Sequence, residues 1–109
     1  MSQCLLYATA ASRDEALALG RTLVEARLAA CANVLDGMTS VYRWQDELRE
    51  DREAVLILKT RAEFADAAIA RLRELHSYDC PCVLRLPIEG GNPEFLAWIA
   101  AETAPVNRD

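Results

Sequence analysis

Two stretches of this chain decide its fold: Arg27-Leu28-Ala29-Ala30-Cys31-Ala32-Asn33 and, soon after, Ser40-Val41-Tyr42-Arg43-Trp44. The first stretch is rich in small and apolar residues, and we interpret it as the end of a helix. The second has aromatic residues at alternate positions, which is typical of a β-strand. The pair predicts a helix that leads directly into a long strand over about residues 32–45. Asp36-Gly37 predicts a bend or bulge within that strand.

The predicted helices are found by working outward from this junction. Ser12 and Glu15 form a capping-box pattern that starts the first helix. One face of this helix is predicted to carry Leu17, Gly20, Val24 and Leu28, with Ala16, Leu19 and Leu23 beside it. A second helix over residues 62–75 has apolar residues at helical spacing, namely Phe64, Ala68, Leu72 and Leu75. A last helix starts at Pro93, with Phe95, Leu96 and Ile99 as its apolar stripe.

The remaining apolar runs predict strands at residues 4–8, around residues 55–58 and at residues 83–86. A polar turn is expected at Asp46-Glu47 and another over residues 87–91, and the tail from residue 104 to 109 is expected to be loose. The order β-α-β-β-α-β plus a terminal helix predicts an α+β fold. Its economical form is a ferredoxin-like split β-α-β sandwich with an antiparallel sheet and an extra C-terminal helix, in a single domain of residues 1–109.

Composition narrows the class of protein. The chain has 109 residues, of which 52% are hydrophobic and 27% charged, as expected of one globular domain. No apolar run approaches the roughly 20 residues that span a bilayer, and Met1-Ser2-Gln3 lacks the positive charge of a secretory signal. We therefore expect a cytoplasmic protein with no membrane partner and four free cysteines. The net charge of −5 argues against nucleic acid as a partner.

The central strand is apolar on both faces, because Val55 and Ile57 alternate with Leu56 and Leu58. Leu5 and Leu6 repeat this pattern in the first strand. Two helices cover only one face of such a sheet, so the other face needs a partner. The simplest partner is another copy of the chain, and we therefore expect a homo-oligomer.

Three further segments complete a pattern that covers the chain from about residue 5 to 103. They are Leu56-Ile57-Leu58-Lys59-Thr60, His76-Ser77-Tyr78-Asp79-Cys80-Pro81 and Gly91-Asn92-Pro93-Glu94-Phe95-Leu96-Ala97-Trp98-Ile99. With the two opening stretches, this ordered set resembles the CutA divalent-ion tolerance family. The resemblance implies the ferredoxin-like fold, a homotrimer with sheets packed face to face, and a role in divalent metal ion tolerance.

The candidate metal ligands are Cys31, His76, Cys80 and Cys82. If Cys80-Pro81-Cys82 is extended, both thiols point to one side, and thiolates with an imidazole suit Cu(I), Zn or Hg(II). The alternative is that these are ordinary buried thiols. The resemblance implies copper binding by cysteines and by the histidine of a His-Pro-Tyr-Glu-x-Pro segment. Here Ser77 replaces its first proline, Asp79 replaces its glutamate, and Cys31 matches the family cysteine after a double alanine.

Tyr42 and Trp44 share one face of their strand. They could line a small-molecule cleft between subunits, with polar groups supplied by Lys59, Tyr78 and Asp79, or they could simply pack at the subunit contact. Lys59 stands in an apolar strand, so its amine must reach water, pair with a carboxylate such as Glu53 or Asp79, or meet an anion.

The sequence thus predicts a CutA-like cytoplasmic homotrimer without enzymatic activity, which takes part in divalent metal tolerance and binds copper or another soft metal. One alternative is a trimer similar to the PII nitrogen-signalling proteins, with a small-molecule cleft between subunits. Those proteins carry a long mobile loop, whereas residues 45–48 predict a short turn. A second alternative is an enzyme that acts through Lys59 and Asp79, although no catalytic set of residues supports it.

Overall fold

The computed structural model describes residues 2–104 and has the predicted order of elements. These are β1 (Gln3–Ala10), α1 (Arg13–Glu25), β2 (Cys31–Trp44), β3 (Glu47–Arg61), the short 3₁₀ turn η1 (Ala62–Phe64), α2 (Ala65–Leu75), β4 (Val83–Ile88) and α3 (Pro93–Glu102). The prediction of an α+β, ferredoxin-like fold with an extra C-terminal helix is confirmed. The prediction of a loose tail falls almost entirely on residues 105–109, which lie outside the described part. Within residues 2–104 no helix is both long and apolar enough to span a membrane.

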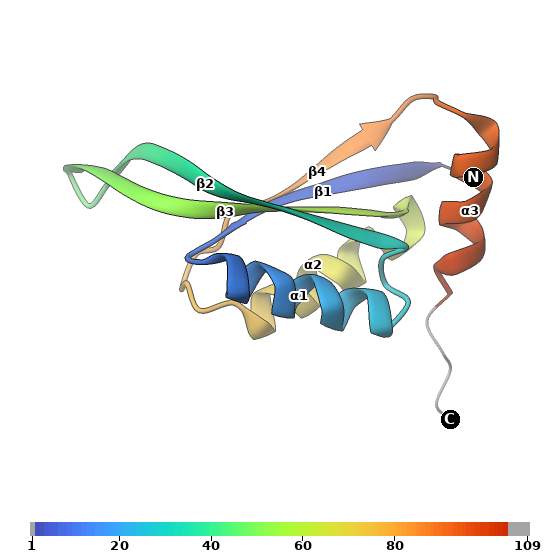
Figure 1. Ribbon diagram of the computed structural model, residues 1–109, viewed down its shortest axis with the longest axis horizontal. Helices are drawn as coiled ribbons and strands as arrows, with labels where there is room; N and C mark the ends of the chain where they lie inside the picture. Colours follow the sequence, from blue (N-terminus) through green and yellow to red (C-terminus); the bar gives the residue numbers. More distant parts are fainter. Residues whose placement is uncertain (1, 105–109) are drawn as a thin grey trace.

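The sheet has the order β2-β3-β1-β4, and every neighbouring pair is antiparallel. Helices α1 and α2 lie against one face of it, and the hairpin of β2 and β3 reaches well beyond the helix layer (Figure 1). Helix α3 stands at the opposite end of the sheet, where the Gln3 side-chain amide donates a 3.0 Å hydrogen bond to the Leu96 carbonyl. We call the sheet surface opposite α1 and α2 the open face.

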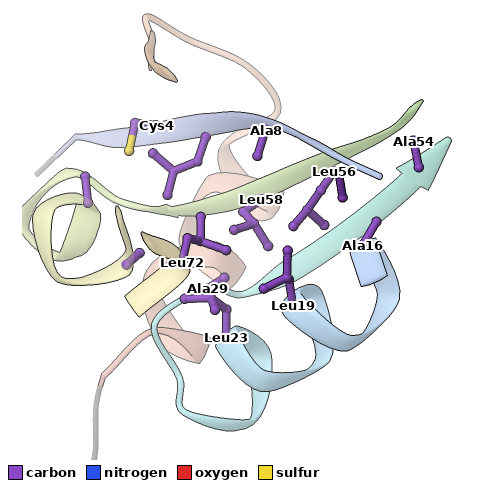
Figure 2. Close-up of a cluster of buried hydrophobic side chains, with 14 residues drawn as sticks. Cys4, Ala8, Ala16, Leu19, Leu23, Ala29, Ala54, Leu56, Leu58 and Leu72 are labelled. Atoms are coloured by element: carbon purple, nitrogen blue, oxygen red, sulfur yellow. The ribbon is translucent and has the colours of Figure 1, made fainter. Parts of the chain in front are cut away.

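The core lies between the helices and the side chains of β1 and β3 that point toward them. In the β1–β3 ladder Leu6 faces Leu58 and Ala8 faces Leu56, and all four are buried. Figure 2 shows leucines of β3 meeting leucines of α1 and α2, for which the labelled examples are Leu19, Leu23, Leu56, Leu58 and Leu72. Burying one such side chain stabilises the fold by about 1.5–3 kcal/mol. This layer therefore supplies much of the driving force for folding.

Helix α1 starts as predicted, but it buries a slightly different face. The Ser12 hydroxyl accepts a hydrogen bond from the Glu15 N–H (3.1 Å), while the Glu15 carboxylate accepts one from the Ala11 N–H (3.1 Å) instead of the Ser12 N–H. The buried residues are Ala16, Leu19, Gly20 and Leu23. Val24 is exposed, so the expected stripe through Val24 was wrong by about one position around the helix.

The ends of several elements differ from the prediction for local reasons. The β2–β3 turn is at Gln45 and Asp46, whose φ angles are 51° and 65°, so both residues adopt the left-handed conformation that two-residue hairpin turns favour. Pro87 belongs to β4 and not to a turn, because β4 is an edge strand and needs no N–H at that position. The predicted irregularity at Asp36-Gly37 is confirmed by a register shift between Leu35 and Met38.

The open face is apolar, as the alternation in the strands predicted. Leu35, Leu84 and Leu86 point to this side and are 60%, 57% and 43% exposed. Ile57 of β3 is half-buried beside them. Within the described residues no element of the chain covers these side chains in the way that α1 and α2 cover the other face.

Gly20 marks the point where α1 lies closest to the sheet. A Cβ at this position would lie 2.8 Å from Ala32 Cβ and 3.1 Å from Leu56 Cδ1. Because the Ala32 Cβ is fixed to the backbone of β2, the helix would have to move away to make room.

We therefore expect Gly20→Leu to lower the free energy of unfolding by about 2 kcal/mol. Overpacking costs about 1–3 kcal/mol, and the gain in helix propensity of about 0.8 kcal/mol offsets only part of it. The control is Ala18→Leu, which places the same side chain on the exposed side of α1. Thermal unfolding at fixed protein concentration measures both, and equal melting temperatures would show that the close approach is unimportant.

Candidate functional site

A cavity of about 350 Å³ lies on the open face, where the β2–β3 hairpin meets the loop between α2 and β4. Its exposed lining residues are Tyr42, Trp44, Arg49, Asp79 and Cys80. Its buried or half-buried lining residues are Thr9, Glu53, Tyr78 and Cys82. Four of the five residues predicted for the cleft therefore line one cavity within a single chain.

The two-residue period of the strands explains why these side chains converge. In the β2–β3 ladder Met38 faces Glu53 and Tyr42 faces Arg49, so these residues share one side of the hairpin. Residues 77–82 follow α2 and pass the same end of the sheet. The loop is joined to β1 there by a backbone hydrogen bond from Thr9 N–H to the Cys82 carbonyl (3.3 Å).

Two phenols on this side donate hydrogen bonds to carboxylates. The Tyr78 hydroxyl donates to Glu53 Oε2 at 3.0 Å, and the Tyr42 hydroxyl donates to Asp51 Oδ2. Burial and the bonded Glu53 carboxylate raise the pKa of Tyr78 to about 12. The pKa of Tyr42 is also raised, mainly by its hydrogen bond to Asp51. Both phenols therefore stay protonated near neutral pH and serve as hydrogen-bond donors.

His76 is buried at the end of α2, and both of its ring nitrogens have partners. Nδ1 accepts a hydrogen bond from the Tyr78 N–H (3.1 Å), and Nε2 lies 2.7 Å from the Thr9 carbonyl oxygen. Because an N–H can only donate and a carbonyl can only accept, the neutral ring carries its proton on Nε2. Neither nitrogen offers a lone pair to a metal in this arrangement. The structure thus gives His76 the role of fixing the loop to β1.

Glu15 fixes the same loop to the start of α1. Its Oε2 accepts a 2.9 Å hydrogen bond from the Ser77 N–H, and its Oε1 accepts the bond from Ala11. Burial raises the pKa of Glu15, but these hydrogen bonds outweigh it, so that the pKa is lowered overall. An ionised Glu15 therefore suits this position, 3.9 Å from His76 Nδ1.

The structure brings two of the four predicted metal ligands together. Cys80 and Cys82 line the same cavity, and burial raises the pKa of the Cys82 thiol. Cys31 pairs with Lys59 in the ladder. Cys82 contacts Thr9, which is opposite Val55 in the β1–β3 ladder. Val55 and Lys59 are four residues apart on β3, so Cys31 and Cys82 are separated by about 13 Å along the strand direction.

Across residues 2–104 no three histidine, cysteine or acidic side chains form a cluster that could hold a metal ion. The four predicted ligands therefore do not form one site within a single protomer. Cys80 and Cys82 remain as a pair of thiols at the cavity.

Lys59 does not line the cavity, although the sequence grouped it with the cleft. Its Nζ donates a 2.9 Å hydrogen bond to Asn33 Oδ1 and lies 5.5 Å from the centroid of the Phe95 ring. The amine is thus held by an amide oxygen and an aromatic face at the α3 end of the sheet.

Sequence reasoning missed Thr9 and Arg49 as lining residues, and it considered Glu53 only as a partner for Lys59. The strand period offered a signal for two of them, because Arg49 and Glu53 are an even number of residues apart and share a face with Tyr42. Thr9 carried no comparable signal, since its place depends on the return of the loop after α2.

Comparison with known proteins gives consistent relatives over most of the chain. The model of the family described as CutA1 divalent ion tolerance protein matches residues 4–102. The divalent-cation tolerance protein CutA of Thermus thermophilus is 42% identical over 95 residues, which cover 87% of this chain and 92% of that protein. A chloroplastic CutA 1 protein of Oryza sativa is 36% identical over 91% of this chain, which spans only 56% of that longer protein.

Solved structures agree with this result. The crystal structure of CutA from Xylella fastidiosa superposes with a TM-score of 0.92 at 38% identity, covering 95% of this chain and 100% of that one. The family model covers residues 4–102, and a relative of similar length is 42% identical. Both results point to the same family. This chain belongs to the CutA1 divalent ion tolerance family.

Proposed function

We propose that the chain forms a homotrimer in the cytoplasm and takes part in divalent-cation tolerance without enzymatic activity, by binding copper or another soft metal. The open face is the observation that carries the assembly. Three leucines of this face, Leu35, Leu84 and Leu86, are between 43% and 60% exposed in the single chain. An exposed apolar sheet surface of this kind is typical of a protein interface.

The projecting hairpin supports the same assembly. Trp44 is 45% exposed, and Val41 and Leu48, on the other side of the hairpin, are 62% and 71% exposed. A two-stranded ribbon with apolar side chains on both sides is marginally stable by itself. Contact with neighbouring subunits would bury these side chains, and a closed ring of three copies satisfies every subunit equally.

Two observations support a non-enzymatic role in a reducing compartment. His76, the only histidine of the chain, has both ring nitrogens hydrogen-bonded and so offers no base to a substrate. The four cysteines are free thiols, as expected in the cytoplasm. The rice relative is named as chloroplastic, so subcellular fractionation is the direct test of location.

The PII-like alternative gains no support. The turn between β2 and β3 consists of Gln45 and Asp46, so no long loop joins the central strands. The family match is to CutA1. The role in cation tolerance therefore remains the better proposal, and it rests on that family membership.

For metal binding we propose the thiols of Cys80 and Cys82 as the first ligands. They flank Pro81 and face one cavity, which allows both sulfur atoms to reach one ion. Soft thiolate ligands favour Cu(I) over hard cations such as Mg²⁺ and Ca²⁺. Further ligands, including Cys31 or His76, would have to come from rearrangement or from a neighbouring subunit.

Assembly predicts a defined effect of Leu84→Asp. We expect the wild type to elute from size exclusion with a light-scattering mass of three chains, and Leu84→Asp to be a folded monomer. The reason is that Leu84 is 57% exposed in the single chain, so the charge is tolerated there but not in an apolar interface.

The matched control is Leu75→Asp, which places the same charge at an exposed position on the helix layer. It should leave the mass at three chains. Circular dichroism checks that both variants are folded. A wild type that stays monomeric at micromolar concentration, or a Leu84→Asp variant that still forms trimers, would refute the proposed interface.

Metal binding predicts that Cys80→Ser/Cys82→Ser lowers the affinity for Cu(I) by at least about tenfold in competitive chelator titration. Losing groups that merely orient a ligand already costs about 10–100-fold, so loss of the ligands should cost no less. The affinity of the wild type should also fall as the pH is lowered from about 9 to about 6, because protons compete for the thiolates. Burial raises the pKa of Cys82, which strengthens that competition.

Cys31→Ser is the matched comparison, because this thiol lies near Lys59 and away from the cavity of its own chain. An unchanged affinity limits the site to Cys80 and Cys82, whereas a lower affinity shows that Cys31 of a neighbouring subunit is a further ligand. If the double variant binds Cu(I) as tightly as the wild type, the thiol pair is structural and a direct metal role of this cavity is excluded.

A further inference from the structure

Lys59 carries a charge that its own chain does not neutralise. It is the only lysine of the sequence, and it is half-buried on the open face of β3. Within residues 2–104 it forms no ion pair. Its two partners, the Asn33 side-chain oxygen and the Phe95 ring, are uncharged. They orient the amine but leave its positive charge without a carboxylate.

Negative charge gathers at the other end of the same face. Glu53 is half-buried at the cavity, where the neutral Tyr78 hydroxyl donates to it. Asp51, two residues away on the same side of β3, is also half-buried and also accepts a phenol. Asp79 lines the cavity as well, and Arg49 is the cation among the lining residues. Three carboxylates against one guanidinium leave two negative charges in excess, and across the described residues none of the four forms an ion pair.

Glu53 and Lys59 cannot meet within one chain. They are six residues apart on the same side of β3, a backbone distance of about 20 Å, which is more than the two side chains can span. Between them on that side lie the apolar residues Val55 and Ile57, and Leu84 of β4 is on the same face. The open face therefore has a positive end, an apolar centre and a negative end.

A second copy of the chain can bring the unlike ends together. In a closed ring of three copies each subunit uses two different surface patches, one toward each neighbour. A neighbour that covers the open face also removes water from Lys59 and Glu53. A charge that loses water without gaining an opposite charge is costly, so the contact is favourable only if the positive end of one copy lies at the negative end of the next.

We propose that Lys59 of each subunit enters the cavity of a neighbouring subunit and forms an ion pair with the neighbouring subunit's Glu53. The cavity is incomplete in a single chain and receives its missing cation from the second copy. The nearby carboxylates of Asp51 and Asp79 add to the attraction. This inference rests on the proposed trimer and names the contact that aligns its subunits, and it does not involve metal binding.

Zero-length cross-linking with a carbodiimide tests the contact directly, because it joins an amine to a carboxylate that touches it. Lys59 and Glu53 both lie between Arg52 and Arg61. After digestion with trypsin the expected product is therefore this segment joined to a second copy of itself, which only two subunits can supply. We expect it, by mass spectrometry, in material that runs as two and three chains on a denaturing gel.

Lys59→Arg is the matched control for the cross-linking. It keeps the positive charge but lacks the reactive amine. The cross-linked product should therefore disappear, while the light-scattering mass stays at three chains.

Exchange of the two charges gives an independent measurement. Lys59→Glu and Glu53→Lys each place like charges together, so each should raise the protein concentration at which half of the trimer dissociates by at least about tenfold. The double variant restores opposite charges and should return to within about threefold of the wild type. Arg73→Glu and Glu25→Lys make the same charge changes at exposed positions of the helix layer and should leave the concentration unchanged.

A wild type with the mass of three chains but no product joining Lys59 to Glu53 would overturn this inference and leave the trimer standing. A double variant that dissociates as readily as the single variants would do the same. A monomeric wild type would instead refute the proposed assembly, and this inference with it. Circular dichroism checks the fold of each variant, and cross-linking of the wild type decides the matter even where an exchanged variant does not fold.

Discussion

The pairing of β1 with β3 is the constraint on which the other features depend. Leu6 opposite Leu58 and Ala8 opposite Leu56 point toward the helices, and they fix which side of every strand faces the core. A shift of one residue would turn all of these side chains away. The same register sends the alternate apolar residues to the open face and places Glu53 at the cavity. The core, the open face and the cavity are therefore consequences of one alignment of two strands.

A second group of contacts holds the cavity in shape. His76 joins the end of α2 to the Thr9 carbonyl, and Glu15 joins the next residue to the start of α1. The loop that carries Tyr78 is thus tied to two different elements, by a buried hydrogen bond at His76 and an exposed one at Ser77. The buried bond is costly to break without replacement. This accounts for the place of the single histidine in the protein better than a role as a metal ligand, because its ring nitrogens are already used.

The sequence predicted the elements well because they depend on local periods, and it predicted the site only in part. Alternation in residues 55–58 and the cap at Ser12 need no knowledge of the rest of the chain. The position of Lys59 depends on Asn33 and Phe95, which are distant in sequence, so no strand pattern could show that it lies apart from the cavity of the single chain. Thr9 joins the cavity only through the return of the loop after α2. Contacts of this kind follow from the folded arrangement and leave no periodic signal.

The left-handed turn at Gln45 and Asp46 has a consequence for the energetics of the whole chain. It lets β2 and β3 continue as a twisted ribbon far past the helices, into a region with no core of its own (Figure 1). The molecule therefore has two levels of stability. Amides beside Leu56 and Leu58 exchange with solvent only when the domain unfolds, whereas those near the ribbon tip can exchange through local opening. The ribbon therefore gains its stability from whatever it touches and adds little to the cooperative unfolding of the core.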